Sequence, residues 1–198
     1  MSSEFLELPN LSVLKAKLPD DLYNKILKEC LQCKKNNKKF DTGLTATGTP
    51  NHYKLKDTTN DLFNFLSPLI DEWFKKHPNY MKDSFSILDK DCPFSLSEPW
   101  INLQEKNKFL PIHKHDGILS YSIWIKIPYE KSNKKFYSFQ FVYNNIIGLN
   151  NIHDFQLGKK DEGTILIFPS LLNHIVFPFY SSKEKRISVS GNIIIQVT

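Results

Sequence analysis

The sequence predicts a mainly β fold, an antiparallel sandwich or jelly roll, supported by helices in its N-terminal part. Two helical patterns occupy the first part of the chain. From about residue 84 the sequence changes to short β-branched and aromatic runs that Pro, Gly, Asn and charged turns separate. Helices followed by a series of strands are typical of an antiparallel sheet with helices on one face. We expect one domain over residues 1–198, with a helical supporting region at 1–83 and the β core at 84–198.

Charge and apolar spacing define the two predicted helices. The first opens at Asp20 with two acidic residues and closes near the lysines at 34–35, the arrangement that the helix dipole favours. The second begins after Thr58 and ends before Pro78, and its apolar residues recur at spacings of three and four. We expect both apolar stripes to pack against the sheet.

Seven short runs after residue 84 have the composition of strands. In some runs aromatic residues occupy every second position, so that Phe139, Phe141 and Tyr143 would share one face of a strand. The runs cover residues 85–89, 99–106, 118–127, 136–143, 164–168, 174–179 and 186–197. Their number and length favour two packed sheets.

The composition excludes several partners and locations. The net charge of +5 is modest, and the basic run at residues 34–39 lacks interleaved aromatic residues, so we expect no nucleic-acid partner. No apolar run approaches the ~18 residues of a membrane span, and the N-terminus lacks a signal-peptide pattern, so we expect no membrane partner. Three cysteines suit a reducing cytoplasm, and we expect Cys30 and Cys33 to be buried helix thiols.

Two histidines one residue apart, His113 and His115, stand at the entrance of a strongly apolar run. On a strand, residues i and i+2 point to the same face, so both side chains can converge on one point. His174 opens another predicted strand and can approach them from across the fold. The pattern fits a metal site, although a histidine alone is more often an ordinary hydrogen-bonded residue. We interpret the other three as such ordinary residues: His52, His77 and His153, the last in an exposed Asn-rich loop.

Arg186, Ser188 and Ser190 share one face of the last predicted strand, which is rich in Val and Ile. Burying an arginine and two hydroxyls against a β core costs free energy unless an anion binds to them. A structural ion pair is the alternative, because Arg186 follows the charged turn at residues 181–185. Together with the histidines, the pattern favours a site for a metal and an anion.

The region from Pro99 to Ile195 resembles the Fe(II)- and 2-oxoglutarate-dependent dioxygenases, in particular small prolyl-hydroxylase-like members of the kind encoded by marine tailed phages and bacteria. The matching segments are PWINLQ (99–104), PIHKHDGILSYSIWIKIP (111–128), GTILIFPSLLNHIVFPF (163–179) and RISVSGN (186–192). The resemblance implies a double-stranded β-helix with His113 and His174 as iron ligands. It also implies that Arg186 and Ser188 hold the far carboxylate of 2-oxoglutarate, for which Lys126 is a second candidate.

The chain departs from the family pattern at one position. The usual first motif is His-x-Asp/Glu, which gives two histidines and a carboxylate. Here the i+2 position is His115, and the acid follows one residue later at Asp116. A regular strand favours His115 as the third ligand, whereas the prevalence of carboxylate triads and a bulge at Gly117 favour Asp116. We favour His115 and keep Asp116 as the alternative.

The resemblance implies an enzyme that uses Fe(II), 2-oxoglutarate and O₂, with ascorbate as an optional reductant. The enzyme would hydroxylate a C–H bond and release succinate and CO₂. We expect it to act in the cytoplasm, which would be that of the host cell if a phage encodes the protein. Peptidyl proline is the favoured substrate and a small molecule the alternative, selected by loops at residues 40–56 and 144–160. Two other classes stay open: a cupin-type metalloprotein or three-histidine dioxygenase that needs no 2-oxoglutarate, and a non-catalytic β-sandwich binding module.

Overall fold

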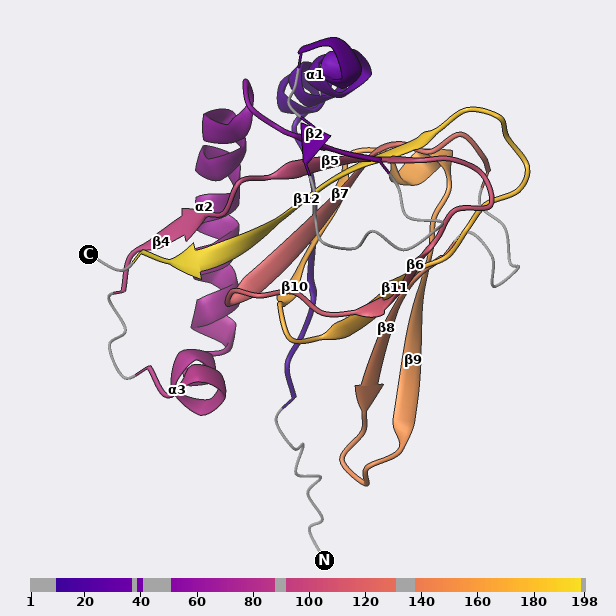
Figure 1. Ribbon diagram of the computed structural model, residues 1–198. Helices are drawn as coiled ribbons and strands as arrows, with labels where there is room; N and C mark the ends of the chain where they lie inside the picture. Colours follow the sequence, from indigo (N-terminus) through magenta and orange to yellow (C-terminus); the bar gives the residue numbers. More distant parts are fainter. Residues whose placement is uncertain (1–9, 37–38, 41–50, 88–91, 131–137, 197–198) are drawn as a thin grey trace, which may run out of the picture.

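The computed structural model describes residues 10–36, 39–40, 51–87, 92–130 and 138–196. Within these residues the chain forms two antiparallel sheets, with the helices gathered beside the larger one (Figure 1). The prediction of a mainly β fold with supporting helices is confirmed.

Strand pairing defines an eight-stranded and a four-stranded sheet in the described part of the chain. The large sheet has the order β1 (Leu14–Lys17), β10 (Thr164–Pro169), β7 (Leu119–Lys126), β12 (Arg186–Ile195), β5 (Trp100–Gln104), β3 (Asn51–Lys54) and β2 (Lys39–Phe40), and β4 (Phe94–Leu96) also pairs with β12. The small sheet has the order β6 (Leu110–His113), β11 (Asn173–Val176), β8 (Ser138–Asn144) and β9 (Asn150–Gln156).

The helices cover one face of the large sheet. They are α1 (Asp20–Asn36), α2 (Thr59–Lys76) and the short α3 (Tyr80–Phe85); a 3₁₀ turn, η1 (Lys159–Asp161), precedes β10. The first two correspond to the two predicted helices, and their buried apolar residues join one core cluster with the sheet: Leu22, Ile26, Leu62, Leu66, Ile70 and Trp73. Among the described residues, no helix is long and apolar enough to cross a membrane.

The central strands of the large sheet are buried on both faces. On β7, Tyr121 and Ile123 belong to the core cluster that the helices cover, whereas Trp124 belongs to a second cluster between the two sheets. Phe139 of β8 and Phe168 of β10 are in that second cluster. This double burial explains why these strands appear in the sequence as nearly continuous apolar runs rather than as strict alternation.

A buried carboxylate links the first two helices. Glu29 of α1 is 6% exposed, and its oxygens accept hydrogen bonds from the backbone N–H groups of Lys56, Asp57 and Thr58 at 2.6–3.0 Å. The hydroxyl of Thr58 donates to the same carboxylate at 2.8 Å. These N–H groups lie just before α2 begins at Thr59, so Glu29 stabilises the start of α2 from a different helix.

Several elements differ from the sequence-based prediction. Strands β1, β2 and β3 lie before residue 84 and join the large sheet, and β9 occupies the segment that we expected to be an Asn-rich loop. The run at 85–89 is not a strand where it is described, because Phe85 ends α3 and residues 86–87 have no regular structure. Residues 41–50 of the first expected substrate loop lie outside the described part. The two helix cysteines are buried free thiols, as expected.

Candidate metal centre

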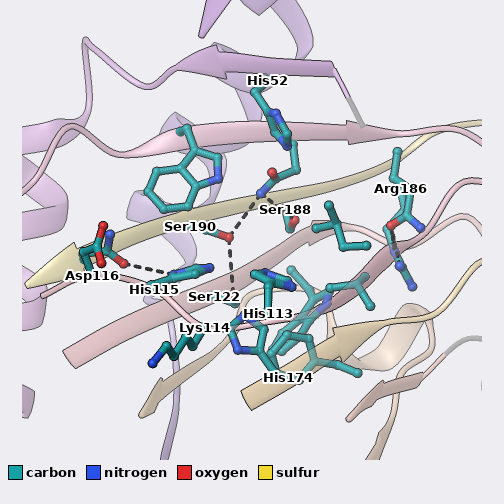
Figure 2. A pocket seen from close by; sticks show the side chains of 18 residues that line it. His52, His113, Lys114, His115, Asp116, Ser122, His174, Arg186, Ser188 and Ser190 are labelled. Atoms are coloured by element: carbon teal, nitrogen blue, oxygen red, sulfur yellow. Dashed lines mark hydrogen bonds between the residues drawn. The ribbon is translucent and has the colours of Figure 1, made fainter. Parts of the chain in front are cut away.

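A cavity of about 390 Å³ lies between the two sheets (Figure 2). Strands β5, β7 and β12 of the large sheet line one side of it, and β6, β8 and β11 of the small sheet line the other. It contains six of the site residues that the sequence predicts, namely His113, His115, Asp116, His174, Arg186 and Ser188. Residues up to 75 positions apart in the sequence therefore share one cavity.

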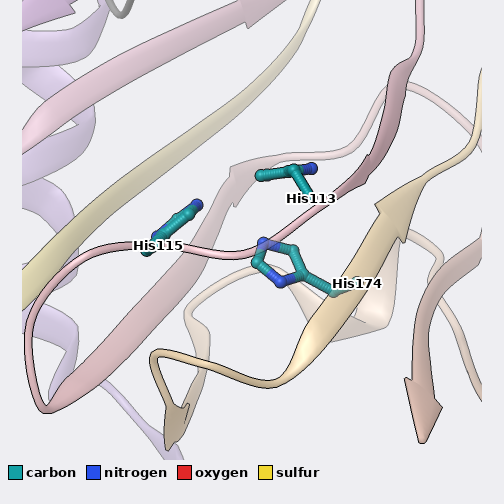
Figure 3. A group of neighbouring side chains, drawn as sticks. All are labelled: His113, His115 and His174. Carbon is teal, nitrogen blue, oxygen red and sulfur yellow. The ribbon is translucent and has the colours of Figure 1, made fainter.

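The three histidines of the predicted site meet at one place (Figure 3). His113 ends β6 and pairs directly with His174 of β11, and their ring centroids lie 4.2 Å apart. The ring of His115 lies 4.8 Å from that of His174 and 5.2 Å from that of His113. One ring nitrogen from each residue lies within 4.8 Å of the others, so the three can hold a single metal ion.

The route by which His115 reaches this group differs from our expectation. Strand β6 ends at His113, so His113 and His115 do not share a regular strand. Instead the loop to β7 carries His115, and its backbone N–H donates to the carbonyl of Ser170 at 2.9 Å. Gly117 follows with φ of +104°, and a Cβ there would lie 2.9 Å from the carbonyl oxygen of Ile193. Glycine thus allows the loop to turn tightly against β12.

Each imidazole has its Nδ1 occupied by a hydrogen-bond acceptor. The Nδ1 of His113 lies 2.7 Å from the carbonyl of Pro111, and that of His174 lies 3.0 Å from the carbonyl of Leu172. The Nδ1 of His115 lies 3.0 Å from the Oδ1 of Asn192. Because these oxygens only accept, each Nδ1 carries the hydrogen and each Nε2 keeps a lone pair for a metal.

The surroundings keep all three rings uncharged. Burial lowers the pKa of His113 and, more strongly, that of His174, and the charge of each neighbouring histidine acts in the same direction on His174. Burial and the neighbouring His113 lower the pKa of His115 to about 4, against smaller opposite effects of Asn192 and Asp116. A metal binds only the neutral imidazole, so the cluster is ready for binding at neutral pH.

Asp116 lines the rim of the cavity but does not join the histidines. Its side chain is exposed, and no carboxylate belongs to the group of ring nitrogens in the part of the chain that the structure describes. The geometry therefore favours His115 over Asp116 as the third donor.

Arg186 is buried at the beginning of β12, with 2% of its surface exposed. Its guanidinium donates to the Oε1 of Gln104 from Nε at 3.0 Å and from Nη2, to the hydroxyl of Tyr129 at 2.6 Å and to the carbonyl of Phe177 at 2.9 Å. Each of these hydrogen-bond acceptors is neutral. A buried cation held by neutral groups is suited to an anionic ligand, which would balance its charge.

Ser188 lies two residues further along the same strand and also lines the cavity. Its hydroxyl accepts a hydrogen bond from the amide of Asn102 at 3.2 Å. Lys126 takes a different direction: its ammonium lies 2.6 Å from a carboxylate oxygen of Glu184, and it is not among the residues that line the cavity. The structure thus brings Arg186 and Ser188 to the cavity and leaves Lys126 in a surface ion pair.

The comparison with protein families agrees with this arrangement. A family model described as a putative 2OG-Fe(II) oxygenase matches residues 98–192, the segment that carries every predicted site residue. This match and the site together support an oxidoreductase of the Fe(II)- and 2-oxoglutarate-dependent oxygenase type. No curated protein sequence matches it.

Three solved structures share the fold of this oxygenase over most of its length. A prolyl-4-hydroxylase from Pseudomonas putida has a TM-score of 0.58 at 13% identity and covers 93% of this chain and 92% of its own. A Trichoplax adhaerens prolyl hydroxylase in complex with a hypoxia-inducible-factor peptide has a TM-score of 0.57 at 9% identity, with 92% and 83% coverage. HygX from Streptomyces hygroscopicus, with nickel, 2-oxoglutarate and hygromycin B bound, has a TM-score of 0.58 at 10% identity, with 93% and 83% coverage.

The likeness identifies the two sheets of this oxygenase as a double-stranded β-helix, which confirms the predicted fold class. Oxygenases of this family use Fe(II), 2-oxoglutarate and O₂. The donor set fits this use, because neutral imidazoles are suitable nitrogen ligands for Fe(II) and a buried guanidinium is suitable for a carboxylate.

The site of the oxygenase also contains residues that sequence reasoning did not assign. His52 is 5% exposed and lines the cavity. Asn192, Gln104 and Tyr129 contact the predicted residues directly. A signal for Asn192 was present, because it continues the i, i+2 series of inward polar residues on β12. Tyr129 follows β7 in a loop, where no periodic pattern marks it.

Proposed function

We propose that this oxygenase is a hydroxylase that holds Fe(II) with His113, His115 and His174 and anchors 2-oxoglutarate with Arg186 and Ser188. One observation carries the proposal. Three uncharged imidazoles that each keep a free Nε2 share a cavity with a buried guanidinium whose hydrogen-bond partners are neutral. The cavity thus offers a metal-binding end and an anion-binding end.

The proposed metal ligands are held in place by hydrogen bonds to their Nδ1 atoms. Two of the acceptors are backbone carbonyls only two residues away in sequence, at Pro111 and Leu172, so the ring orientations of His113 and His174 follow from local backbone geometry. Such hydrogen bonds fix the tautomer of a ligand and raise its basicity. Bound Fe(II) would supply the activation of O₂, coupled to conversion of 2-oxoglutarate to succinate and CO₂.

Arg186 is proposed to bind the far carboxylate of 2-oxoglutarate. Gln104, Tyr129 and Phe177 hold the guanidinium plane, so little conformational entropy is lost when the carboxylate binds. A charge-assisted hydrogen bond of this kind contributes ~1.5–3 kcal/mol. Ser188, on the same face of β12, would donate a further hydrogen bond to the carboxylate.

The proposed substrate is a peptidyl prolyl residue, with a small molecule as the second candidate. Two of the structural neighbours are prolyl hydroxylases, one of them in complex with a peptide, whereas HygX is in complex with hygromycin B. Trp124 and Phe139 line the inner wall of the cavity and would limit the access of water to the reacting C–H bond. The buried free thiols Cys30 and Cys33 support a reducing compartment, the cytoplasm.

An anaerobic titration tests the proposal. Purified protein is loaded with Fe(II) and then with 2-oxoglutarate while the visible absorbance is recorded. We expect a charge-transfer band that requires both additions. His113→Ala and His174→Ala should keep a cooperative unfolding transition but lose iron binding, whereas Lys126→Ala should behave like the wild type. Iron binding without a response to 2-oxoglutarate would instead support a cupin-type metalloprotein, and full iron occupancy in either histidine variant would exclude this site.

A further inference from the structure

His115, the proposed ligand that departs from the family pattern, has an acceptor of its own on β12. The Oδ1 of Asn192 lies 3.0 Å from the Nδ1 of His115 and 2.8 Å from the Oγ of Ser120, which donates to it. The Oγ of Ser120 lies 2.9 Å from the Oγ of Ser170. Ser120 and Ser170 are fully buried.

The oxygen of the Asn192 amide faces the His115 ring in the structure. Because Ser120 donates its hydrogen to Asn192, the hydroxyl of Ser170 must donate to Ser120. The oxygen of Asn192 then accepts from Ser120 and from His115, and both of its lone pairs are used. With the amide in this orientation, Nδ1 is the protonated nitrogen of His115.

Backbone contacts hold Asn192 itself in position. The carbonyl of Asn192 accepts a hydrogen bond from the backbone N–H of Ser97 at 2.9 Å, and the backbone N–H of Asn192 donates to the Oγ of Ser97 at 3.1 Å. On the other side, the N–H of Ile118 donates to the carbonyl of Ile193 at 2.8 Å, which attaches the loop of His115 to the same part of β12. Asn192 is thus a fixed point on a central strand.

We propose that Asn192 is the positioning residue of His115 and directs its Nε2 to the metal. A side chain carried by a loop does not receive its orientation from strand geometry, as His113 and His174 do. The Asn192 amide supplies that orientation, and Ser120 and Ser170 maintain it. The inference rests on the proposed function, because it assigns a role to Asn192 only if His115 binds the metal.

A set of variants tests this role with Co(II) as the probe and its d–d absorption spectrum as the readout. Asn192→Leu has nearly the same shape but cannot accept a hydrogen bond, whereas Asn192→Asp can. Loss of a hydrogen bond to a metal ligand typically lowers metal affinity 10–100-fold. We expect Asn192→Leu to lose about tenfold or more in Co(II) affinity and to show a changed d–d spectrum. Asn192→Asp should restore both to near the wild-type values.

The matched control is Asn102→Leu, which makes the same change in the same cavity. The Asn102 amide donates to Ser188 and Ser190 and to no imidazole, so Co(II) affinity should be unchanged. Thermal unfolding of the metal-free variants checks folding. If Asn192→Leu lacks a cooperative transition, Asn192→Ala carries the same comparison.

A double-mutant cycle with His115→Ala separates this inference from the proposed function. If Asn192 acts through His115, Asn192→Leu should cause no further loss of Co(II) affinity once His115 is alanine. Wild-type affinity in Asn192→Leu, together with reduced affinity in His115→Ala, would overturn the role of Asn192 and leave the metal site intact. Wild-type affinity in His115→Ala would instead remove His115 from the proposed site.

Discussion

His115 and Asp116 differ in the side chains that surround them. His115 points to the other two histidines and is held by Asn192, whereas Asp116 is exposed at the rim. The first prediction compares His115→Ala with Asp116→Ala by measuring anaerobic Fe(II) affinity. We expect Fe(II) affinity to fall on the order of a hundredfold in the first variant and less than about threefold in the second. A direct metal ligand contributes more to metal affinity than a nearby charge does. Loss in Asp116→Ala alone would restore the usual carboxylate triad.

The lowered pKa values of the histidines predict how the stability of the metal-free protein depends on pH. Each of the three has a lower pKa in the folded protein than the 6.5 of a free histidine, and that of His115 is about 4. The unfolded chain therefore takes up protons first as the pH falls. The free energy of unfolding should be highest above pH 6.5 and fall towards pH 4. His115 alone contributes roughly 3 kcal/mol to this fall, and His113 and His174 lower the free energy of unfolding further in the same direction.

Urea unfolding of the metal-free protein between pH 4 and 8 measures this effect. The variant His115→Gln should show a flatter dependence because one of the titrating groups is removed. A free energy of unfolding that rises towards pH 4 would contradict the assignment of neutral histidines to the folded state.

At the same scale, the sequence predicted the candidate metal- and anion-binding residues but not the residues that hydrogen-bond to them. His113, His174 and Arg186 were recognisable in the sequence because an imidazole or a guanidinium beside an apolar strand is costly to bury unless it binds a partner. Gln104 and Asn192 are ordinary amides, and nothing in their type distinguishes them from surface residues. The i, i+2 series on β12 places Asn192 on the inward face, but the roles of both amides follow from the register of β12 with β5 and from the loop that carries His115.

At the scale of elements, one buried carboxylate connects α1 to the start of α2. Glu29 accepts three backbone N–H groups and a hydroxyl and is almost completely buried. We predict that Glu29→Ala lowers the free energy of unfolding by about 2–3 kcal/mol, because buried N–H donors lose their acceptor. Chemical denaturation checks this value, with the exposed Glu72→Ala in α2 as the control. Equal stability of the two variants would show that water replaces the carboxylate.

The elements that the sequence predicted are those with a strong periodic or continuous apolar pattern. Helices α1 and α2 have such a stripe, and β7 and β10 are nearly continuous apolar runs because both faces of the large sheet are covered there. The missed strands β1 and β9 lie at sheet edges and have mostly half-buried or exposed side chains. The four residues of β1 alternate in burial but form too short a run to distinguish a strand from a loop, and the Asn and His residues of β9 give no clear alternation.

At the scale of the whole molecule, the large sheet connects the supporting helices to the cavity. Alternate residues of β12 serve both purposes: Ile187 and Val189 pack towards the helices, whereas Arg186, Ser188 and Ser190 line the cavity. The general fold could therefore be predicted from the pattern of the core. The substrate could not, because the expected selecting segments carry no pattern that specifies a ligand.

The central claim is that the cavity binds iron at one end and 2-oxoglutarate at the other. The most direct test measures succinate formed per iron-loaded enzyme across a range of 2-oxoglutarate concentrations, for the wild type, Arg186→Ala and the control Lys126→Ala. Arg186→Ala should bind Fe(II) normally but require roughly ten- to a hundredfold more 2-oxoglutarate, as ~1.5–3 kcal/mol of lost binding implies. Lys126→Ala should match the wild type. An Arg186→Ala curve that coincides with the wild type at low 2-oxoglutarate would contradict the account.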